Sequence, residues 1–442
     1  MEVKVALVSL GCDKNLVDSE YMLGSLLEKG YSITGEIGDA DIIIINTCGF
    51  INSAKEESIN TILEMAEYKK RGKCKLLIAT GCLSQRYGDQ LLKEIPELDA
   101  VIGTGDFLKL PDLIEQVKVS RLNITRNKTV IDYDIKKRVN TLKYVSYVKI
   151  AEGCNNRCSY CAIPLIKGPY KSRPMDSIKE EVEFLVSRGI KEINIVAQDT
   201  TSYGIDMYGK PSLPELLKKL TDVQGEFWIR VLYAYPTHIN DELLEIISCS
   251  PKIAKYLDIP LQHISDRILR LMNRPTNSEQ IKKLIEKVRN VVPDIALRTT
   301  FIVGFPTETE SDFRELINFI KTYHFDRVGA FKYSREEGTC AATLRPQVPE
   351  KIKKKRFDTL MRVQQDISKN KNEKLVGSIL TVLAENYDSK RKLFIGRSQK
   401  DAPEVDGTVI FTADKCEPGQ FCKVKVTKAF EYDLYGEAVQ IL

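Results

Sequence analysis

Three cysteines gather in one short segment, Gly153-Cys154-Asn155-Asn156-Arg157-Cys158-Ser159-Tyr160-Cys161, directly after an apolar run typical of a strand. Iron–sulfur clusters are usually held by four cysteine thiolates, and closely spaced cysteines let one loop wrap a cluster. This loop supplies only three thiols. A metal site that lacks one protein ligand keeps a coordination position free for another molecule, as open catalytic zinc sites do. The spacing of Cys154, Cys158 and Cys161 therefore predicts an iron–sulfur cluster with one open iron.

A zinc site and a disulfide with a spare thiol are the alternative interpretations of this loop. Zinc ribbons use paired C-x₂-C knuckles or histidines, and the histidines of the chain, His238, His263 and His324, are remote in sequence. Disulfides belong mainly to secreted proteins, and residues 1–5 do not resemble the start of a secretory signal. We therefore expect a cytoplasmic protein whose cysteines serve metal binding.

A second set of three cysteines follows three expected strands near the N-terminus. The strands and the cysteines that follow them are residues 3–10 with Cys12, 41–47 with Cys48, and 75–80 with Cys82. Expected helices at 18–29 and 53–70 separate these apolar runs, which indicates a parallel sheet covered on both faces. Parallel strands share their C-terminal edge, where open α/β sheets bind ligands. Although a single cysteine there would more often be a core residue, three at equivalent places predict a second three-thiolate cluster.

Two glycines support this interpretation, because Gly11 and Gly81 directly precede Cys12 and Cys82 and would let the backbone turn sharply. The other five cysteines show no such pattern, and we expect them to be packing or incidental residues. They are Cys74, Cys249, Cys340, Cys416 and Cys422.

The same alternation of strands and helices continues along the chain. A fourth strand at 99–104 and a helix at 108–117 complete a first domain, residues 1–119, and a polar stretch, 120–143, is expected to be a linker. Six further strands separated by helices predict a partial or open (β/α)6 barrel over residues 144–370, with its chemistry at the C-terminal strand ends.

Residues 371–442 have a different character, with about five short strands and turns that predict a small antiparallel β-barrel. The barrel segment carries 11 Lys and Arg against 11 Asp and Glu, which argues against a phosphate-binding surface. A charged segment at 350–374, expected to be helical, precedes it and contains Lys353-Lys354-Lys355-Arg356, for which we expect a solvated helix face rather than an RNA contact.

Length and composition fit an enzyme of several domains. The chain has 442 residues, of which 43% are hydrophobic, and a net charge of +5. The charge is small for this size, so a nucleic-acid partner is less expected. The sequence contains no run of about 18 apolar residues, so we expect no membrane partner.

The C-x₃-C-x₂-C spacing, with an aromatic residue before the last cysteine, resembles the signature of radical S-adenosylmethionine (SAM) enzymes. In these enzymes the open iron chelates SAM, and the reduced cluster breaks a C–S bond of SAM to give a 5′-deoxyadenosyl radical. The chain as a whole resembles the methylthiotransferases, which convert an unactivated C–H into C–S–CH₃. The resemblance implies an α/β fold with a flavodoxin-like N-terminal sheet, a radical SAM barrel and a TRAM-like C-terminal barrel.

The resemblance also implies the cofactors and their ligands. Cys12, Cys48 and Cys82 would hold an auxiliary 4Fe-4S cluster whose open iron binds the sulfur to be transferred. The second 4Fe-4S cluster, on the other three cysteines, would cleave SAM. One SAM would donate the methyl group and another would yield the radical. A sulfur donor and a low-potential electron donor are the implied partners.

The family modifies either an adenosine in transfer RNA or an aspartate of the small-subunit ribosomal protein S-12. Five segments resemble the ribosomal-protein branch: Leu10-Gly11-Cys12-Asp13-Lys14-Asn15-Leu16-Val17-Asp18-Ser19-Glu20, Ala197-Gln198-Asp199-Thr200-Thr201, Tyr233-Ala234-Tyr235-Pro236, Asp258-Ile259-Pro260-Leu261-Gln262-His263, and Arg397-Ser398-Gln399-Lys400-Asp401-Ala402-Pro403-Glu404-Val405-Asp406-Gly407. Asp13 departs from the proline common in that branch. We therefore expect methylthiolation of an aspartate of S-12, with a tRNA methylthiotransferase as the alternative.

Six further residues are candidates for the site. Tyr160, Gln198 and Gln262 are expected near SAM, and Tyr233, Tyr235 and His263 are expected near the substrate. For each glutamine the alternative is a satisfied loop hydrogen bond, and for the aromatic residues it is a place in the core. An alternative of another class is a non-catalytic iron–sulfur electron carrier or an RNA-binding protein, but a carrier gains nothing from an open iron.

Overall fold

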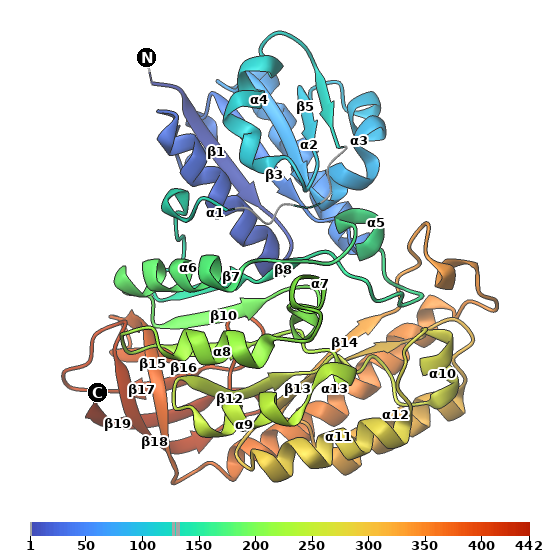
Figure 1. The fold of residues 1–442 in the computed structure, drawn as a ribbon, viewed down its shortest axis with the longest axis vertical. Coiled ribbons are helices and arrows are strands. Elements are labelled where there is room, and N and C mark those ends of the chain that lie inside the picture. The colour runs from blue at the N-terminus through green and yellow to red at the C-terminus, as the bar shows by residue number, and fades with distance from the viewer. Residues whose placement is uncertain (1, 126–128, 130–132) are drawn as a thin grey trace.

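The computed structural model describes residues 2–125, 129 and 133–442 and contains two parallel sheets and a closed barrel (Figure 1). The first sheet has the strand order β2-β1-β3-β4-β5-β6, and all its pairs are parallel. Its strands are β1 (Lys4–Ser9), β2 (Ser32–Ile33), β3 (Ile42–Thr47), β4 (Leu76–Gly81), β5 (Ala100–Ile102) and β6 (Leu122–Ile124). This confirms the parallel N-terminal sheet, and it adds β2 and β6 to the four expected strands.

Helices cover both faces of this first sheet. Apolar residues of α1 (Asp13–Glu28) and α4 (Leu110–Val117) pack on one face, and those of α2 (Asn52–Arg71) and α3 (Cys82–Glu94) pack on the other. Burial on both faces explains why β3 and β4 are continuous apolar runs.

The second sheet forms the core of the molecule, with the parallel strand order β14-β13-β12-β11-β10-β7. Its strands are β7 (Val145–Lys149), β10 (Glu192–Val196), β11 (Trp228–Val231), β12 (Ile253–Asp258), β13 (Ala296–Val303) and β14 (Arg327–Lys332). The larger helices between them are α6 (Met175–Ser187), α8 (Leu213–Thr221), α9 (Asp241–Cys249), α11 (Ser278–Val291) and α12 (Glu310–Tyr323). Shorter elements complete this part, namely β8 (Ala151–Glu152), β9 (Lys171–Ser172), α5 (Ile163–Lys167), α7 (Ile205–Tyr208) and α10 (Asp266–Leu271).

The core sheet is open, as expected for a partial (β/α)6 barrel, because its end strands β7 and β14 do not pair with each other. Its helices cover one face, and apolar residues of α1 pack with residues of the other face. One apolar cluster runs from Tyr21 on α1 through Tyr147 on β7 to Tyr256 on β12. The N-terminal domain therefore packs directly on the inner face of the core.

The C-terminal segment is the expected small barrel, closed in the order β15-β16-β17-β19-β18. Its strands are β15 (Ile379–Asp388), β16 (Leu393–Ser398), β17 (Val409–Thr412), β18 (Phe421–Ala429) and β19 (Leu434–Ile441). One pair, β17 with β19, is parallel, and the other pairs are antiparallel.

Helix α13 (Glu350–Glu373) joins the core to the barrel, and its basic run does not form a wholly solvated face. Lys354 and Lys355 are exposed, but Lys353 and Arg356 are buried. The Lys353 ammonium donates to Tyr333 O at 2.9 Å, and Arg356 pairs with Glu308 at 2.9 Å. The expectation of a solvated face is therefore wrong for these two residues, because positions 353 and 356 lie on the side of the helix that packs on the core.

The barrel docks on the N-terminal ends of the core strands through buried charges. Glu192, the first residue of β10, accepts from Arg230 of β11 and from Arg397 of β16, each at 2.8 Å. Nearby, Arg298 donates to Asp406 at 2.9 Å. Burial alone would raise the pKa of Glu192, but the two guanidinium groups hold that pKa below its ordinary value.

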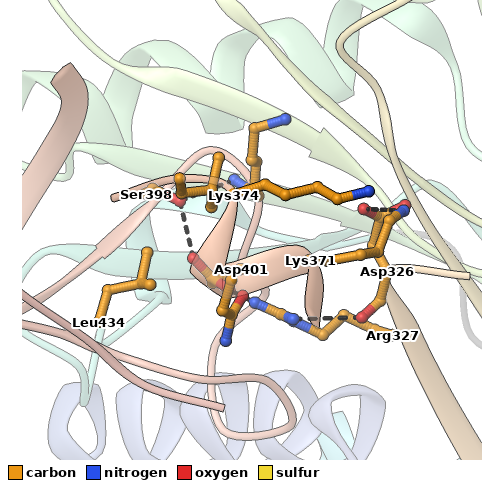
Figure 2. A pocket seen from close by; sticks show the side chains of 10 residues that line it. Asp326, Arg327, Lys371, Lys374, Ser398, Asp401 and Leu434 are labelled. Atoms are coloured by element: carbon orange, nitrogen blue, oxygen red, sulfur yellow. Dashed lines mark hydrogen bonds and ion pairs between the residues drawn. The ribbon is translucent and has the colours of Figure 1, made fainter. Parts of the chain in front are cut away.

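Figure 2 shows a cavity of about 160 Å³ at this junction, lined by residues of β14, α13 and the barrel. In the cavity wall, Lys371 donates to Asp326 at 2.6 Å, while Arg327 pairs with Asp401. No candidate site residue lines this cavity.

The segment expected as a linker begins with structure of its own. Strand β6 pairs with β5 and so belongs to the first sheet. Further along, Arg138 is buried between Glu20 of α1 and Glu181 of α6. Residues 126–128 and 130–132 of the expected linker lie outside the described residues, and the domain boundaries stay predictions. Among the helices that are described, none is long and apolar enough to cross a membrane.

Candidate active site

The N-terminal set of cysteines sits on one edge of the first sheet. Cys12 lies between β1 and α1, Cys48 directly follows β3, and Cys82 opens α3 directly after β4. Because β1, β3 and β4 are parallel neighbours, all three cysteines leave the sheet at its C-terminal edge. The structure thus brings together the three cysteines that the sequence paired with strands.

Glycines make the close approach of these loops possible. Gly11 has φ +92°, and a Cβ on it would lie 2.8 Å from the Cβ of Cys48. Gly81 also has φ +92°, and a Cβ there would lie 2.4 Å from Asn46 Oδ1. Any side chain would therefore both strain the backbone and push the loops apart.

Asn15, on the first turn of α1, connects the three loops, and sequence reasoning missed it. Its amide nitrogen donates to Leu10 O at 3.0 Å and to Thr47 O at 3.1 Å. Its amide oxygen lies 3.8 Å from the thiol of Cys82. One side chain therefore contacts the loop that carries each cysteine. No local pattern marked this residue, because the expected helix began only at residue 18.

The second set lies in the loop that follows β8. Gly153 has φ +79° and approaches Pro169 O so closely that a Cβ would lie 2.1 Å away. The far side of the loop is held by Ser159, whose backbone N–H donates to Met272 O at 2.9 Å and whose hydroxyl donates to Leu271 O at 2.7 Å. Both ends of the cysteine loop are thus anchored to the core.

Arg274, a second residue that sequence reasoning missed, places a positive charge beside this loop. Its Nη1 lies 3.9 Å from Cys158 Sγ, and its guanidinium stacks 4.2 Å from the ring centre of Tyr235. Nη2 donates to Pro260 O at 2.7 Å, which fixes the group although it is almost fully buried. Arg274 therefore places a fixed positive charge beside the cysteine loop.

All six cysteines are free, and their environments fit a cluster. Burial raises the pKa of Cys154 to about 11 and the pKa of Cys82 to about 12, so these thiols stay protonated at neutral pH without metal. A bound metal deprotonates a coordinating thiol outright. Within the described residues no three Cys, His, Asp or Glu side chains are spaced to hold a single ion.

The two sets approach each other across the junction of the domains. Cys82 packs with Ala162 and Ile166, which follow the last cysteine of the second set. Lys167 lies near enough to Cys82 to lower its pKa, against the larger opposite effect of burial. The third loop of the first set is therefore in contact with the segment that leaves the second.

Tyr233 and Tyr235 lie between the two sets, at the end of β11. The ring of Tyr233 faces the ammonium of Lys14, which lies 3.4 Å from the ring centre and follows Cys12 by two residues. Tyr235 stacks on Arg274 beside Cys158. Tyr233 has φ +61°, an uncommon conformation for an aromatic residue. One short loop thus reaches from one cysteine set to the other.

Gln198 and Gln262 lie beyond the ends of β10 and β12. Gln198 Nε2 donates to Glu152 at 2.5 Å, and its buried Oε1 has no hydrogen-bond partner among the described residues. Gln262 is held by its backbone, because its N–H donates to Thr300 O at 2.8 Å. The side chain of Gln262 is partly exposed. Their contacts with SAM stay predictions.

Tyr160 and His263 are packed into the protein. Tyr160 joins a cluster with Met272 and Phe305, and burial raises its pKa well above the ordinary value. His263 is fully buried and accepts from the N–H of Ser265 at 3.0 Å. Burial lowers the pKa of His263 to about 3, so the ring is neutral at physiological pH. Roles of these residues at SAM or substrate stay predictions.

Comparison with known proteins agrees with this architecture. Residues 4–103 match the model of an uncharacterized protein family, UPF0004, residues 148–320 match the radical SAM superfamily, and residues 376–439 match a TRAM domain. Among solved structures, the radical SAM methyltransferase TsrM from Kitasatospora setae has a TM-score of 0.56 at 13% identity, with 86% of this chain and 81% of that chain covered. At this identity the likeness concerns the fold alone. The fold and the cysteine loop together define a radical SAM enzyme, a class that uses an iron–sulfur cluster and SAM.

Relatives that are similar over their full length show which family of radical SAM enzymes the chain belongs to. The ribosomal protein uS12 methylthiotransferase RimO of Caldicellulosiruptor saccharolyticus is 53% identical, with 99% of this chain and 100% of the relative covered. The protein of the same name from Desulforamulus reducens is 48% identical, with 99% of each chain covered. The chain belongs to the family of the ribosomal protein uS12 methylthiotransferases.

Proposed function

We propose that this enzyme methylthiolates an aspartate of ribosomal protein uS12, the S-12 of the small subunit, and that it uses two 4Fe-4S clusters. Cys12, Cys48 and Cys82 would hold one cluster, and the cysteines of the loop after β8 would hold the other. The observation that carries the proposal is the contact of Cys82 with Ala162 and Ile166. Transfer of sulfur to a carbon requires that the sulfur and the activated carbon meet, and this contact supports two adjacent clusters.

When bound, the clusters and SAM supply the radical, the sulfur and the methyl group. The residues of the chain position them. Asn15 ties the loops of the first set together, and Arg274 offsets negative charge at Cys158. Gln198 has one buried, unpartnered oxygen that can accept a hydrogen bond from SAM. Apolar packing of α1 against the core, as between Tyr21 and Tyr147, shields part of the junction from water.

A protein substrate is favoured over tRNA by the charges of the C-terminal barrel. Its net charge is zero, with 11 Lys and Arg against 11 Asp and Glu. Several of its charged groups are used to dock the barrel on the core, among them Arg397, Asp401 and Asp406. Little positive charge is left to follow a phosphate backbone. A ribosomal protein as substrate also supports a cytoplasmic location, with a sulfur donor and a low-potential reductant as partners.

The proposal is tested by mass spectrometry. Reconstituted protein is incubated without oxygen with SAM, sulfide and reductant, and a uS12-derived peptide and bulk tRNA are offered in parallel. We expect a gain of about 46 Da, for SCH₃ in place of H, on an aspartate of the peptide. A gain on tRNA nucleosides alone would refute the proposed substrate while leaving the chemistry intact.

A matched variant tests the number of clusters. In Cys48→Ala the SAM-cleaving loop is unchanged, so 5′-deoxyadenosine should still form while no methylthio product appears. Cys340→Ala, which changes an exposed cysteine outside both sets, is the control and should behave as the unchanged protein. Full product formation by Cys48→Ala would contradict a second cluster.

A further inference from the structure

The ammonium of Lys14 occupies an unusual position between the two cysteine sets. Lys14 is the second residue of α1, two positions after Cys12, and only 9% of it is exposed. Its Nζ lies 3.4 Å from the ring centre of Tyr233, on the loop that also carries Tyr235 beside Cys158. Cys12 itself is exposed, so this end of α1 reaches the surface.

The hydrogen bonding of this ammonium is incomplete. A lysine ammonium has three donors. Within the part of the chain that the structure describes, the only hydrogen bond of Lys14 Nζ is to Asp13 Oδ1, at 2.9 Å. The face of Tyr233 supplies a second attraction without accepting as a carboxylate does. The group therefore retains capacity for another anionic acceptor.

Asp13 is a removable partner. It is adjacent to Lys14 in the chain and shares its carboxylate with the backbone N–H of Lys14, at 2.8 Å. The pair joins neighbouring residues of one helix turn, so it ties no separate elements together. A buried ion pair of this kind contributes little to stability compared with apolar residues of similar size. A structural role alone does not account for a charge placed here.

Resting on the proposed function, we propose that Lys14 binds the carboxylate of the substrate aspartate and that Asp13 holds that position until the substrate displaces it. The reacting carbon of an aspartate is next to its carboxylate. A carboxylate held at Lys14 would place that carbon beside Cys12 and in front of Tyr233, between the two cysteine sets. Lys14 is then a specificity-determining residue, because an adenine ring carries no anionic group at this place.

Peptide binding tests this proposal without the reaction. Fluorescence anisotropy would measure the binding of two labelled uS12-derived peptides, one with the target aspartate and one with asparagine in its place. We expect Lys14→Met to weaken binding of the aspartate peptide about tenfold, because a charge-assisted hydrogen bond is lost. The asparagine peptide should bind this variant and the unchanged protein equally. Lys14→Arg, which keeps the charge, should bind the aspartate peptide more tightly than Lys14→Met.

Asp13 provides a test of opposite sign. Asp13→Asn removes the competing carboxylate and should tighten binding of the aspartate peptide severalfold. A loss of structure could weaken binding in Lys14→Met, but it would not tighten binding in Asp13→Asn. The proposal is overturned if Asp13→Asn leaves binding unchanged or weaker, or if Lys14→Met weakens both peptides alike.

The outcomes separate this proposal from the proposed function. Unchanged protein that modifies neither peptide nor tRNA would overturn the proposed function itself. The role of Lys14 alone would be overturned by two results together: the protein without substitutions modifies the peptide, and Lys14→Met has the same KM for that peptide. A raised KM in Lys14→Met, with 5′-deoxyadenosine still formed from SAM, supports it.

Discussion

Asn15 and Arg274 are single side chains that contact the two proposed cluster sites. Asn15 hydrogen bonds across loops that come from different strands, and Arg274 brings positive charge to Cys158 from a segment more than 100 residues away in sequence. Neither residue is itself a ligand candidate. Both act on the thiols through geometry or charge, which is how the surroundings of a metal site commonly tune it.

For Asn15→Ala we expect loss of iron from the N-terminal set, because the three loops lose their common hydrogen-bond partner. Iron per chain after reconstitution should fall toward the amount that the second set holds alone. Asn277→Ala is the matched control, since the Asn277 side chain caps α11 by accepting from the backbone N–H of Gln280 and does not join the loops of the N-terminal set. It should cost about 1 kcal/mol of stability and no iron. Equal iron in Asn15→Ala and the unchanged protein would contradict this role.

For Arg274→Met we expect a more negative reduction potential of the cluster on the second set. Removing a nearby cation destabilises the more negatively charged, reduced form. An EPR-monitored redox titration would measure the shift, and Arg274→Lys, which keeps the charge, should recover part of it. An unchanged potential in Arg274→Met would show that the guanidinium serves packing on Tyr235 alone.

Among the helices and strands, those with a strong hydrophobic periodicity could be predicted from the sequence, and those without it could not. The apolar strands β3 and β4 and the helices of the core follow directly from their patterns. Strands β2 and β6 have two and three residues, too few to show a period. The first turn of α1 was missed because Asp13, Lys14 and Asn15 are polar, although Lys14 and Asn15 are buried.

The site follows the same division. The positions of the N-terminal cysteines at one sheet edge followed from their place after parallel strands, while the role of all six cysteines as ligands stays a prediction. Partners such as Arg274 were not, since nothing in the local sequence shows that it lies beside Cys158. The burial of Lys353 and Arg356 in α13 could not be predicted either. Charged residues are expected to be exposed unless they are paired, and the partners of these two lie far away in the sequence.

The docking of the barrel yields a prediction at this scale. Glu192→Gln removes the buried carboxylate that Arg230 and Arg397 share, which should lower the free energy of unfolding by about 3–5 kcal/mol. Glu385→Gln is the matched control, because Glu385 contacts the same Arg397 but its side chain is 20% exposed. Chemical denaturation would compare them, and equal losses would contradict the importance of burial.

Low pH should destabilise the same contact between the barrel and the core. The pKa of Glu192 is lowered in the folded protein from its ordinary value of 4.5, so its contribution to stability is complete above that pH and is lost as the pH falls through the folded-state pKa. Hydrogen exchange of β16 would follow the loss. Glu192→Gln should show a smaller dependence on pH below 4.5 than the unchanged protein does.

The whole molecule depends on buried charges between its first sheet and its core. Lys149 of β7 contacts Asp18 of α1 and donates to Glu152 at 2.7 Å. Elsewhere on the same junction, Glu336 accepts from Lys55 at 2.8 Å and from Arg86 at 2.9 Å. These contacts fix how the edge that carries one cysteine set faces the loop that carries the other.

We expect Asp18→Asn to weaken the packing of the N-terminal domain against the core. It leaves the ammonium groups of Lys149 and Lys167 with one carboxylate, that of Glu152, in a buried place, at a cost of about 3–5 kcal/mol. Thermal unfolding should then separate into two steps. The control is Asp112→Asn, which removes an exposed ion pair with Lys29 and should change stability by at most about 1 kcal/mol. A single sharp transition in Asp18→Asn would refute this dependence.

The ion pair between Glu192 and Arg397 can form only late in the synthesis of the chain. Arg397 follows Glu192 by 205 residues. A ribosome adds about 5–20 residues per second, so the nascent chain waits roughly 10–40 s for this partner. During that interval all six cysteines have already been made, while the opposite ends of the core strands are still uncovered. Both cysteine sets are thus synthesised before the barrel that covers the opposite strand ends, and a stalled or truncated chain would expose the buried charges of Glu192 and Arg230 to solvent.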